Sequence, residues 1–172
     1  MKRTRSEKRL PLTDLIACLT EERKNGRTVV FTNGCYDILH AGHLHLLERA
    51  SQLGDVVVVG LNGDRSVRRL KGGSRPWVDF DDRADLLAGL EVVDYVIGFE
   101  EDTPERIMEA IRPDVMVKGG DYTQETLPEK DTANRIACRI EIVPFRSHRS
   151  TTGLVDRIVR AGGDDPGRRF SG

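Results

Sequence analysis

The sequence lacks several features that would each mark a particular class of protein. Its three cysteines, Cys18, Cys35 and Cys138, are odd in number and have no metal-ligand spacing. This argues against both a disulfide framework and a cysteine-bound metal. No apolar run approaches the roughly 20 residues that a membrane helix needs. The basic residues 1–9 are followed by no apolar signal-peptide core. We therefore expect reduced thiols in a cytoplasmic protein that does not bind a membrane.

A bias of charge is also missing. The 27 basic and 28 acidic residues give a formal net charge of −1. A nucleic-acid-binding protein usually carries a basic excess, so we expect no nucleic-acid partner. A chain of 172 residues is long enough for one domain with its own core. We predict that the domain spans residues 11–161, between flexible tails at 1–10 and 162–172.

Apolar runs alternate with segments of helical spacing along the chain. Strands are expected at residues 28–31, 55–61, 95–98, 115–118 and 140–144, and helices lie between and around them. Asp79 can cap the next helix, whose inner face is predicted to carry Leu86, Leu87 and Leu90. The inner face of the last helix is predicted to carry Leu154, Val155, Ile158 and Val159. This alternation predicts an α/β fold with a doubly wound parallel sheet, which binds ligands at the carboxyl ends of its strands.

One stretch stands out after the strand at 28–31, and it reads Thr32-Asn33-Gly34-Cys35-Tyr36-Asp37-Ile38-Leu39-His40-Ala41-Gly42-His43. Asn33-Gly34 is a turn signal, so we predict strand, tight loop and helix. His40 and His43 bracket the start of that helix. Unpaired backbone N–H groups and the helix dipole make such a start an anion site. Gly42 would let a phosphate approach the backbone. The pattern indicates a loop that handles nucleotides.

This segment resembles the His-x-Gly-His signature of the nucleotidylyltransferase superfamily. Its sequence is especially similar to that of the bacterial heptose 1-phosphate adenylyltransferases, the nucleotidyltransferase half of the ADP-heptose synthesis enzymes. The resemblance runs from about residue 11 to about residue 159. It implies a Rossmann-like domain that transfers a nucleoside monophosphate from ATP, with Mg²⁺, to D-glycero-β-D-manno-heptose 1-phosphate. The products would be ADP-heptose and pyrophosphate.

The resemblance also implies roles for residues. His40, His43 and Lys71 are expected to be catalytic, with His43 at the transition-state oxygen and Lys71 closing over the phosphates. Nucleotide binding is expected of Thr32, Asn33, Gly34, Gly42, Lys118, Gly119, Asp121, Ser150, Thr151 and Thr152. Binding of the acceptor is expected of Asp37, Arg75, Arg83, Asn62 and Asp64. No metal ligand is assigned to the protein, since the triphosphate itself would hold Mg²⁺.

Plainer interpretations of these residues stay open. Asp37 can serve as an Asx-type turn residue, Arg83 as a surface ion pair and Lys71 as part of an exposed loop. The Ser150-Thr151-Thr152 segment would cap a helix in any protein.

One feature departs from the family, whose members often carry an arginine at a fixed offset before this segment. Either Arg146 or Arg149 would have to fill that place.

Alternatives for the whole protein stay open as well. A glycerol 3-phosphate cytidylyltransferase-like enzyme would share the signature, and so would a catalytically silent nucleotide-binding regulatory module. The expected partners are a nucleoside triphosphate and a sugar phosphate. A homodimer through the first helix is left open.

Overall fold

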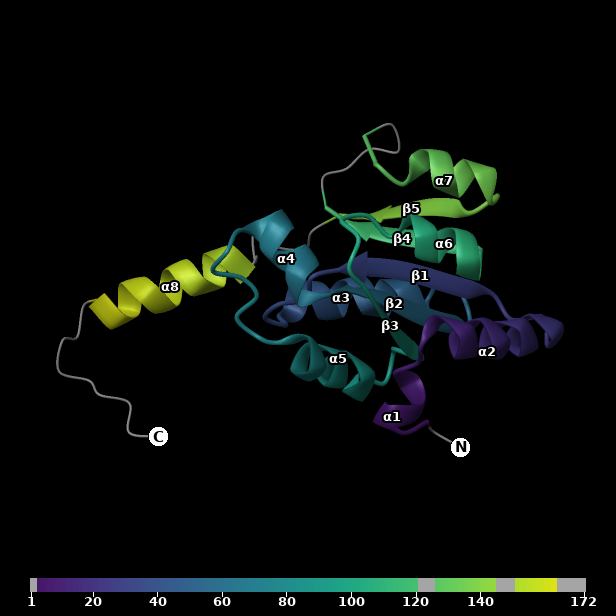
Figure 1. The fold of residues 1–172 in the computed structure, drawn as a ribbon, viewed down its shortest axis with the longest axis horizontal. Coiled ribbons are helices and arrows are strands. Elements are labelled where there is room, and N and C mark those ends of the chain that lie inside the picture. Colours follow the sequence, from purple (N-terminus) through teal and green to yellow (C-terminus); the bar gives the residue numbers. More distant parts are fainter. Residues whose placement is uncertain (1–2, 121–125, 145–150, 164–172) are drawn as a thin grey trace.

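The computed structural model describes residues 3–120, 126–144 and 151–163, and its centre is a sheet of five parallel strands (Figure 1). The strands are β1 (Val29–Gly34), β2 (Val56–Asn62), β3 (Tyr95–Phe99), β4 (Val115–Gly119) and β5 (Arg139–Val143). Their order is β3-β2-β1-β4-β5. The predicted Rossmann-like, doubly wound sheet is thereby confirmed. The chain changes direction across the sheet between β1 and β4, which is where such folds bind ligands.

Helices cover both faces of this sheet. On one face α2 (Leu12–Lys24), α6 (Glu105–Ile111) and α7 (Lys130–Arg135) pack on the strands. On the other face lie α3 (Ala41–Ser51) and α5 (Phe80–Gly89). The remaining helices are α1 (Arg5–Lys8), α4 (Asp64–Lys71) and α8 (Thr151–Gly163). Every residue of β2 is buried, as its unbroken valine run predicts for a strand covered on two sides.

Strand β1 is longer than expected. Asn33 and Gly34 pair with Gly60 and Leu61 of β2, so the Asn-Gly turn prediction was wrong. Parallel pairing with β2 overrides the local turn preference of these two residues. The strand ends at Gly34, and the chain turns at Tyr36, whose φ of 45° is left-handed. Because β1 ends at Gly34 and the predicted strand ended at residue 31, the loop begins three residues later than predicted.

The buried face of α5 also differs from the prediction. Asp79 caps this helix as expected, because its side chain accepts a hydrogen bond from the Asp82 amide. Leu87 is buried, but Leu86 is 53% exposed. Ala84 and Ala88 take the inward positions beside Leu87, since residues three and four apart share a face of a helix.

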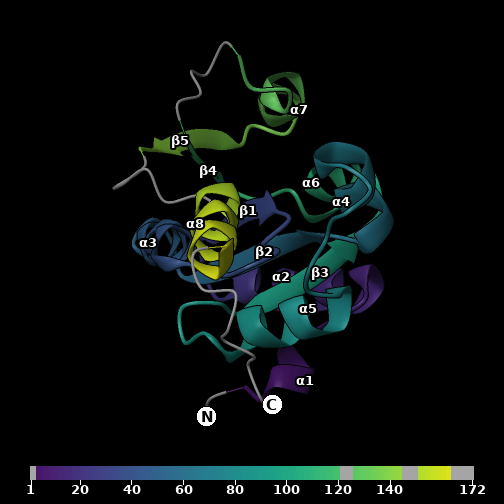
Figure 2. The same cartoon turned by 90° about the vertical axis from the view of Figure 1, so that its left-hand side faces the viewer.

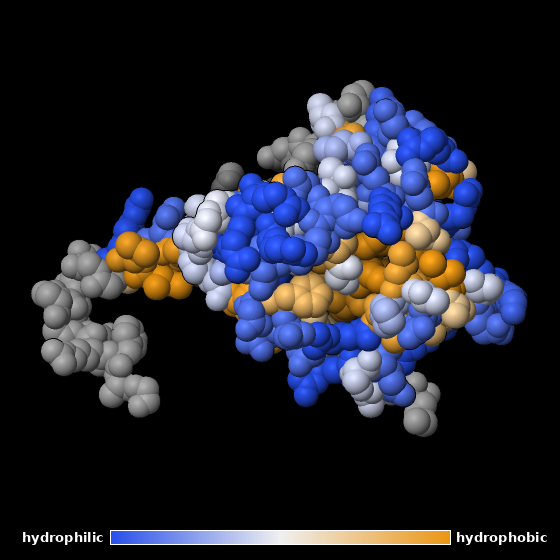
Figure 3. Space-filling model, viewed as in Figure 1, coloured by the Kyte–Doolittle hydropathy of each residue, from blue (hydrophilic) through white to orange (hydrophobic). Residues whose placement is uncertain are grey.

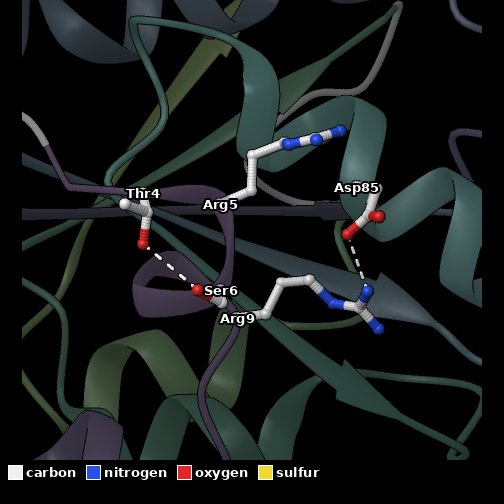
Figure 4. Close-up of a pocket in the computed structure, with 5 residues that line it drawn as sticks. All are labelled: Thr4, Arg5, Ser6, Arg9 and Asp85. Atoms are coloured by element: carbon white, nitrogen blue, oxygen red, sulfur yellow. Dashed lines mark hydrogen bonds and ion pairs between the residues drawn. The ribbon is translucent and has the colours of Figure 1, made fainter.

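The segment before α2 is packed on the domain where a loose tail was expected. Thr4 and Glu7 form a capping box on α1. Arg9 pairs with Asp81 and Asp85 of α5 and bridges to Val96 of β3. A cavity of about 650 Å³ lies here, lined by Thr4, Arg5, Ser6, Arg9 and Asp85 (Figure 4). None of these five residues belongs to the predicted site.

Helix α8 projects away from the sheet, and Figure 2 views the molecule from that side. Ile158 and Val159 are 61% and 67% exposed, so their predicted inward orientation is wrong. Apolar surface is visible along this helix in Figure 3. No other described element covers these two side chains. Among the described residues, no helix combines the length and the apolar character needed to cross a membrane.

Candidate active site

The signature loop places His40 and His43 at the first turn of α3. His40 is the N-cap, and its Nδ1 accepts a hydrogen bond from the Gly42 amide at 3.1 Å. The His43 amide donates to the His40 carbonyl at 2.9 Å. These amides are therefore engaged, which corrects the expectation of an open helix start. A phosphate at this position would have to replace the imidazole cap or use donors beside it.

The two histidine rings are stacked. Their centroids lie 3.8 Å apart with 19° between the ring planes, and the Tyr36 ring centroid lies 5.0 Å from that of His43. Burial, with a smaller contribution from the nearby His40, lowers the pKa of His43 to about 4. Burial also lowers the pKa of His40. Both rings are thus neutral near pH 7 in the free protein, and they offer N–H donors without a full charge.

Asp37 connects the signature loop to the segment before α5. Its buried carboxylate pairs with Arg75 and accepts hydrogen bonds from the amides of Trp77 at 2.8 Å and Val78 at 3.0 Å. The Arg75 guanidinium also lies over the Trp77 ring, 3.9 Å from its centroid. Both carboxylate oxygens of Asp37 are used inside the protein. In this structure the Asp37 carboxylate holds the loop before α5 in place, and the acceptor-binding role of Asp37 and Arg75 stays a prediction.

Arg83 is the largest fully buried side chain of the domain, with no exposed surface. Its guanidinium donates to the carbonyls of Cys35, Asn62 and Val78 and to the Asp64 carboxylate. A surface ion pair and a free acceptor-binding cation are both inconsistent with this burial. Arg83 instead joins the ends of β1 and β2 to the start of α5.

The carboxyl ends of β1 and β4 are joined by a second buried network. Lys118 Nζ donates to Asn33 Oδ1 at 3.0 Å and to Glu129 Oε1 at 2.5 Å. Glu129 is 3% exposed and lies just before α7. Sequence reasoning missed Glu129, because an acidic residue in a polar stretch carries no pattern that marks it as buried.

A comparison with protein-family models identifies the family of this chain. The model described as cytidylyltransferase-like matches residues 31–156, which include the signature loop, Arg83, Lys118 and Glu129. The chain belongs to the cytidylyltransferase-like family. This confirms the predicted nucleotidyltransferase-type domain.

Curated relatives agree with this family assignment. The bifunctional protein HldE of Geobacter metallireducens is 49% identical over 90% of this chain, and that of Syntrophotalea carbinolica is 50% identical over 82%. The chain spans only 31% and 29% of the length of these two relatives.

Two solved structures share the fold of this cytidylyltransferase-like domain. The lipopolysaccharide core biosynthesis protein from Thermoplasma volcanium is 29% identical with a TM-score of 0.59, and the alignment covers 72% of this chain and all of that one. The pantoate–β-alanine ligase from Francisella tularensis is 16% identical with a TM-score of 0.61, over 84% of this chain and 69% of that one. The second likeness supports the fold alone.

Several predicted site residues of this cytidylyltransferase-like domain have buried side chains. Thr32 is fully buried, and Asn62 is buried with its amide nitrogen 2.9 Å from Ser66 Oγ. These side chains therefore support the carboxyl edge of the sheet from within, where direct contact with a ligand was expected. Asn33 and Gly34 end strand β1 and Gly119 ends strand β4, at the same edge of the sheet.

Lys71 is the last residue of α4 and is exposed, next to the glycine loop that was predicted to contain it. Its charge, together with Arg83 and Arg75, lowers the pKa of the Cys35 thiol, although burial raises that pKa by more. The raised pKa also agrees with a packing role for Cys35, since a reactive cysteine needs a stabilised thiolate.

The remaining predicted residues concern α8 and its surroundings. Thr151 Oγ1 lies 3.5 Å from the Ile38 carbonyl oxygen, which brings the start of α8 to the signature loop. Thr152 is exposed in the first turn of α8. Asp121, Ser150, Arg146 and Arg149 lie outside the described residues.

Proposed function

We propose that the chain is an adenylyltransferase that joins AMP from ATP to D-glycero-β-D-manno-heptose 1-phosphate, giving ADP-heptose and pyrophosphate. Support comes from the 49% identity with a bifunctional HldE over nearly the whole chain, and from the solved relative described as a lipopolysaccharide core biosynthesis protein. The sequence of the signature loop, which is similar to that of the ADP-heptose synthesis enzymes, adds to this support.

The single observation that carries the proposal is the stacked histidine pair at the start of α3. It lies where the chain leaves β1, and β1 borders the switch point of the sheet. Two neutral imidazoles at a helix N-terminus can donate hydrogen bonds to phosphate oxygens, and the dipole favours the negative charge.

The proposed reaction needs alignment more than proton transfer. An oxygen of the sugar phosphate attacks the α-phosphorus of ATP, a new P–O bond forms, and the bond to the β-phosphate oxygen breaks. Pyrophosphate leaves with that electron pair. The attacking oxygen is already ionised near neutral pH, so no general base is required. Positioning of two reactants can contribute roughly 7–11 kcal/mol, and one well-placed donor about 3–4 kcal/mol.

The described residues supply these two effects in different ways. His43 donates to the transition-state oxygen, and His40 and Lys71 hold the triphosphate. Asp37 and Arg83 hold the chain segments at the ends of β1 and β2 in fixed positions relative to α5. Because both are buried, they act through the residues that they position.

Mg²⁺ enters this proposal with the nucleotide. Among the described residues, no three or more His, Cys, Asp or Glu side chains are grouped to hold a metal, and the Asp37 carboxylate is already engaged. This donor set fits an ion bound by phosphate oxygens and water, as is usual for Mg²⁺ with a triphosphate. The bound ion would neutralise part of the triphosphate charge.

A pyrophosphate-release assay tests the proposal by crossing ATP, CTP, GTP and UTP with heptose 1-phosphate and with glycerol 3-phosphate. We expect turnover with ATP and heptose 1-phosphate. The family description names cytidylyltransferases, so preferential turnover of CTP with glycerol 3-phosphate would replace this proposal with the alternative enzyme. Absence of turnover with every pair would support a silent nucleotide-binding module.

A further inference from the structure

The buried network of Asn33, Lys118 and Glu129 has hydrogen-bonding capacity that the protein leaves unused. An ammonium carries three N–H donors, and Lys118 Nζ uses two of them on Asn33 and Glu129. Among the described residues, Glu129 Oε2 is buried and has no hydrogen-bond partner. An unpartnered buried carboxylate oxygen costs free energy, so its retention points to a ligand that supplies a donor.

The position of the network fits a ligand site. Asn33 and Lys118 follow the paired residues Thr32 and Val117 on β1 and β4, the two strands that flank the switch point. The Lys118 side chain keeps 15% of its surface exposed. A ligand at the carboxyl edge can therefore reach the ammonium, which contacts the Glu129 carboxylate.

Charge decides which ligand group suits this site. Lys118 and Glu129 form a neutral pair, so their attraction for a phosphate is largely cancelled. A phosphate oxygen would also be repelled by the Glu129 carboxylate and has no proton to donate. A hydroxyl group fits both partners, because its oxygen accepts from the ammonium and its proton goes to the carboxylate.

We infer that Lys118 and Glu129 together bind a sugar hydroxyl of the substrates and do not bind phosphate. This rests on the proposed function for the presence of sugars in the cleft. Either the ribose of the nucleotide or the acceptor sugar can supply the hydroxyl. Glu129 then contributes to the recognition of sugar substrates, a role that no sequence motif assigned to it.

The nucleotide arm of the test measures binding by titration calorimetry and needs no turnover. ATP, 2′-deoxy-ATP and 3′-deoxy-ATP are titrated into the wild-type protein and the Glu129→Gln variant. If the ribose is the source, one deoxynucleotide binds the wild type about tenfold or more weakly, as expected for loss of a hydrogen bond to a charged group. In Glu129→Gln the Kd values of that deoxynucleotide and of ATP should differ by less than about threefold. The hydroxyl and the carboxylate act on each other, so removing one reduces the effect of removing the other.

The acceptor arm applies if both deoxynucleotides bind the wild type as well as ATP does. Acceptor sugar phosphates that each lack one hydroxyl are then compared by KM. For one of them KM should be about tenfold higher than for the intact acceptor in the wild type, and the increase should be much smaller in Glu129→Gln. Glu141→Gln is the matched control, because Glu141 forms an exposed ion pair with Arg139 on β5. This control should keep the wild-type discrimination.

Two results would overturn the inference. One is a wild-type protein that does not discriminate against any deoxy analogue in either arm. The other is a Glu129→Gln variant that weakens every ligand by the same factor, as a purely structural residue would. If Glu129→Gln fails to fold, Glu129→Asp serves in its place, with partial discrimination expected. Discrimination between nucleotides without any turnover would support the inference while rejecting the proposed function.

Discussion

The rings of His40 and His43 stack at 3.8 Å between centroids, on the same side of the first turn of α3. At this distance a charge on one ring disfavours a charge on the other. When a phosphate binds, the two rings therefore take up protons one after the other. His43, which is the more buried of the two, is protonated last.

Replacing His43 by alanine should separate catalysis from binding. We expect kcat to fall by about 10²–10³, the usual loss on removal of one transition-state donor, while the Kd for ATP changes less than about tenfold. Steady-state kinetics with calorimetry measures both. His45→Ala, on the same helix and two residues away, should keep kcat within about twofold. Equal kcat at saturating substrate in the wild type and His43→Ala would contradict the assigned role.

The depressed pKa of His43 predicts how stability depends on pH. Between the ordinary value of 6.5 and about 4, His43 is protonated in the unfolded chain but neutral in the folded protein. The unfolded state then binds more protons, so the free energy of unfolding rises with pH across this window. Acidification from pH 7 to pH 4 should remove roughly 3 kcal/mol through this residue.

Urea unfolding of the wild type and of His43→Asn at several pH values isolates that contribution. The stabilities of the two proteins should converge as the pH falls toward 4, because the variant has no group to protonate. A constant difference from pH 7 to pH 4 would show that His43 keeps an ordinary pKa.

Asp37→Ala should destabilise the fold strongly. The substitution leaves Arg75 and two backbone amides without their buried acceptor, and breaking a buried ion pair costs about 3–5 kcal/mol. Chemical denaturation measures the change. The matched control is Asp102→Ala, which breaks the exposed pair with Arg69 and should cost less than about 1 kcal/mol. Similar losses in the two variants would mean that the Asp37 contacts contribute little.

Arg83→Lys distinguishes a positioning role from direct binding of the acceptor. Lysine cannot reach three carbonyls and a carboxylate at once, so we expect a loss of roughly 3 kcal/mol in stability. The KM values for both substrates should then rise together. An unchanged free energy of unfolding with a higher KM for the sugar phosphate alone would restore the acceptor-binding role predicted from the sequence.

Local patterns predicted the sheet and the helix starts well. The valine run of β2, the cap of Asp79 and the spacing of His40 and His43 each depend on residues close together in the sequence. The contacts of Asp37 with Trp77 and Val78 and of Arg83 with Cys35 join residues about 40 or more positions apart. No periodicity encodes such contacts, so these side chains were assigned to substrates.

The outward face of α8 was mispredicted for a related reason. Its spacing of apolar residues is that of a helix packed on a core, and Ile158 and Val159 follow that spacing. The spacing of apolar residues predicts which of them share a face of the helix. It does not predict which element packs against that face. Burial on a partner element has to come from tertiary structure, which here leaves both side chains exposed.

Arg83 has a consequence for the thermodynamics of substrate binding. By holding the carbonyls of Cys35, Asn62 and Val78 on one guanidinium, it fixes the ends of β1 and β2 and the segment before α5 relative to one another. Ordering a flexible residue costs about 1–2 kcal/mol of backbone entropy, and a loop already fixed does not incur that cost when a nucleotide arrives. The cleft is in this sense preorganised, and association should show a smaller entropy loss than in a variant whose loops are released.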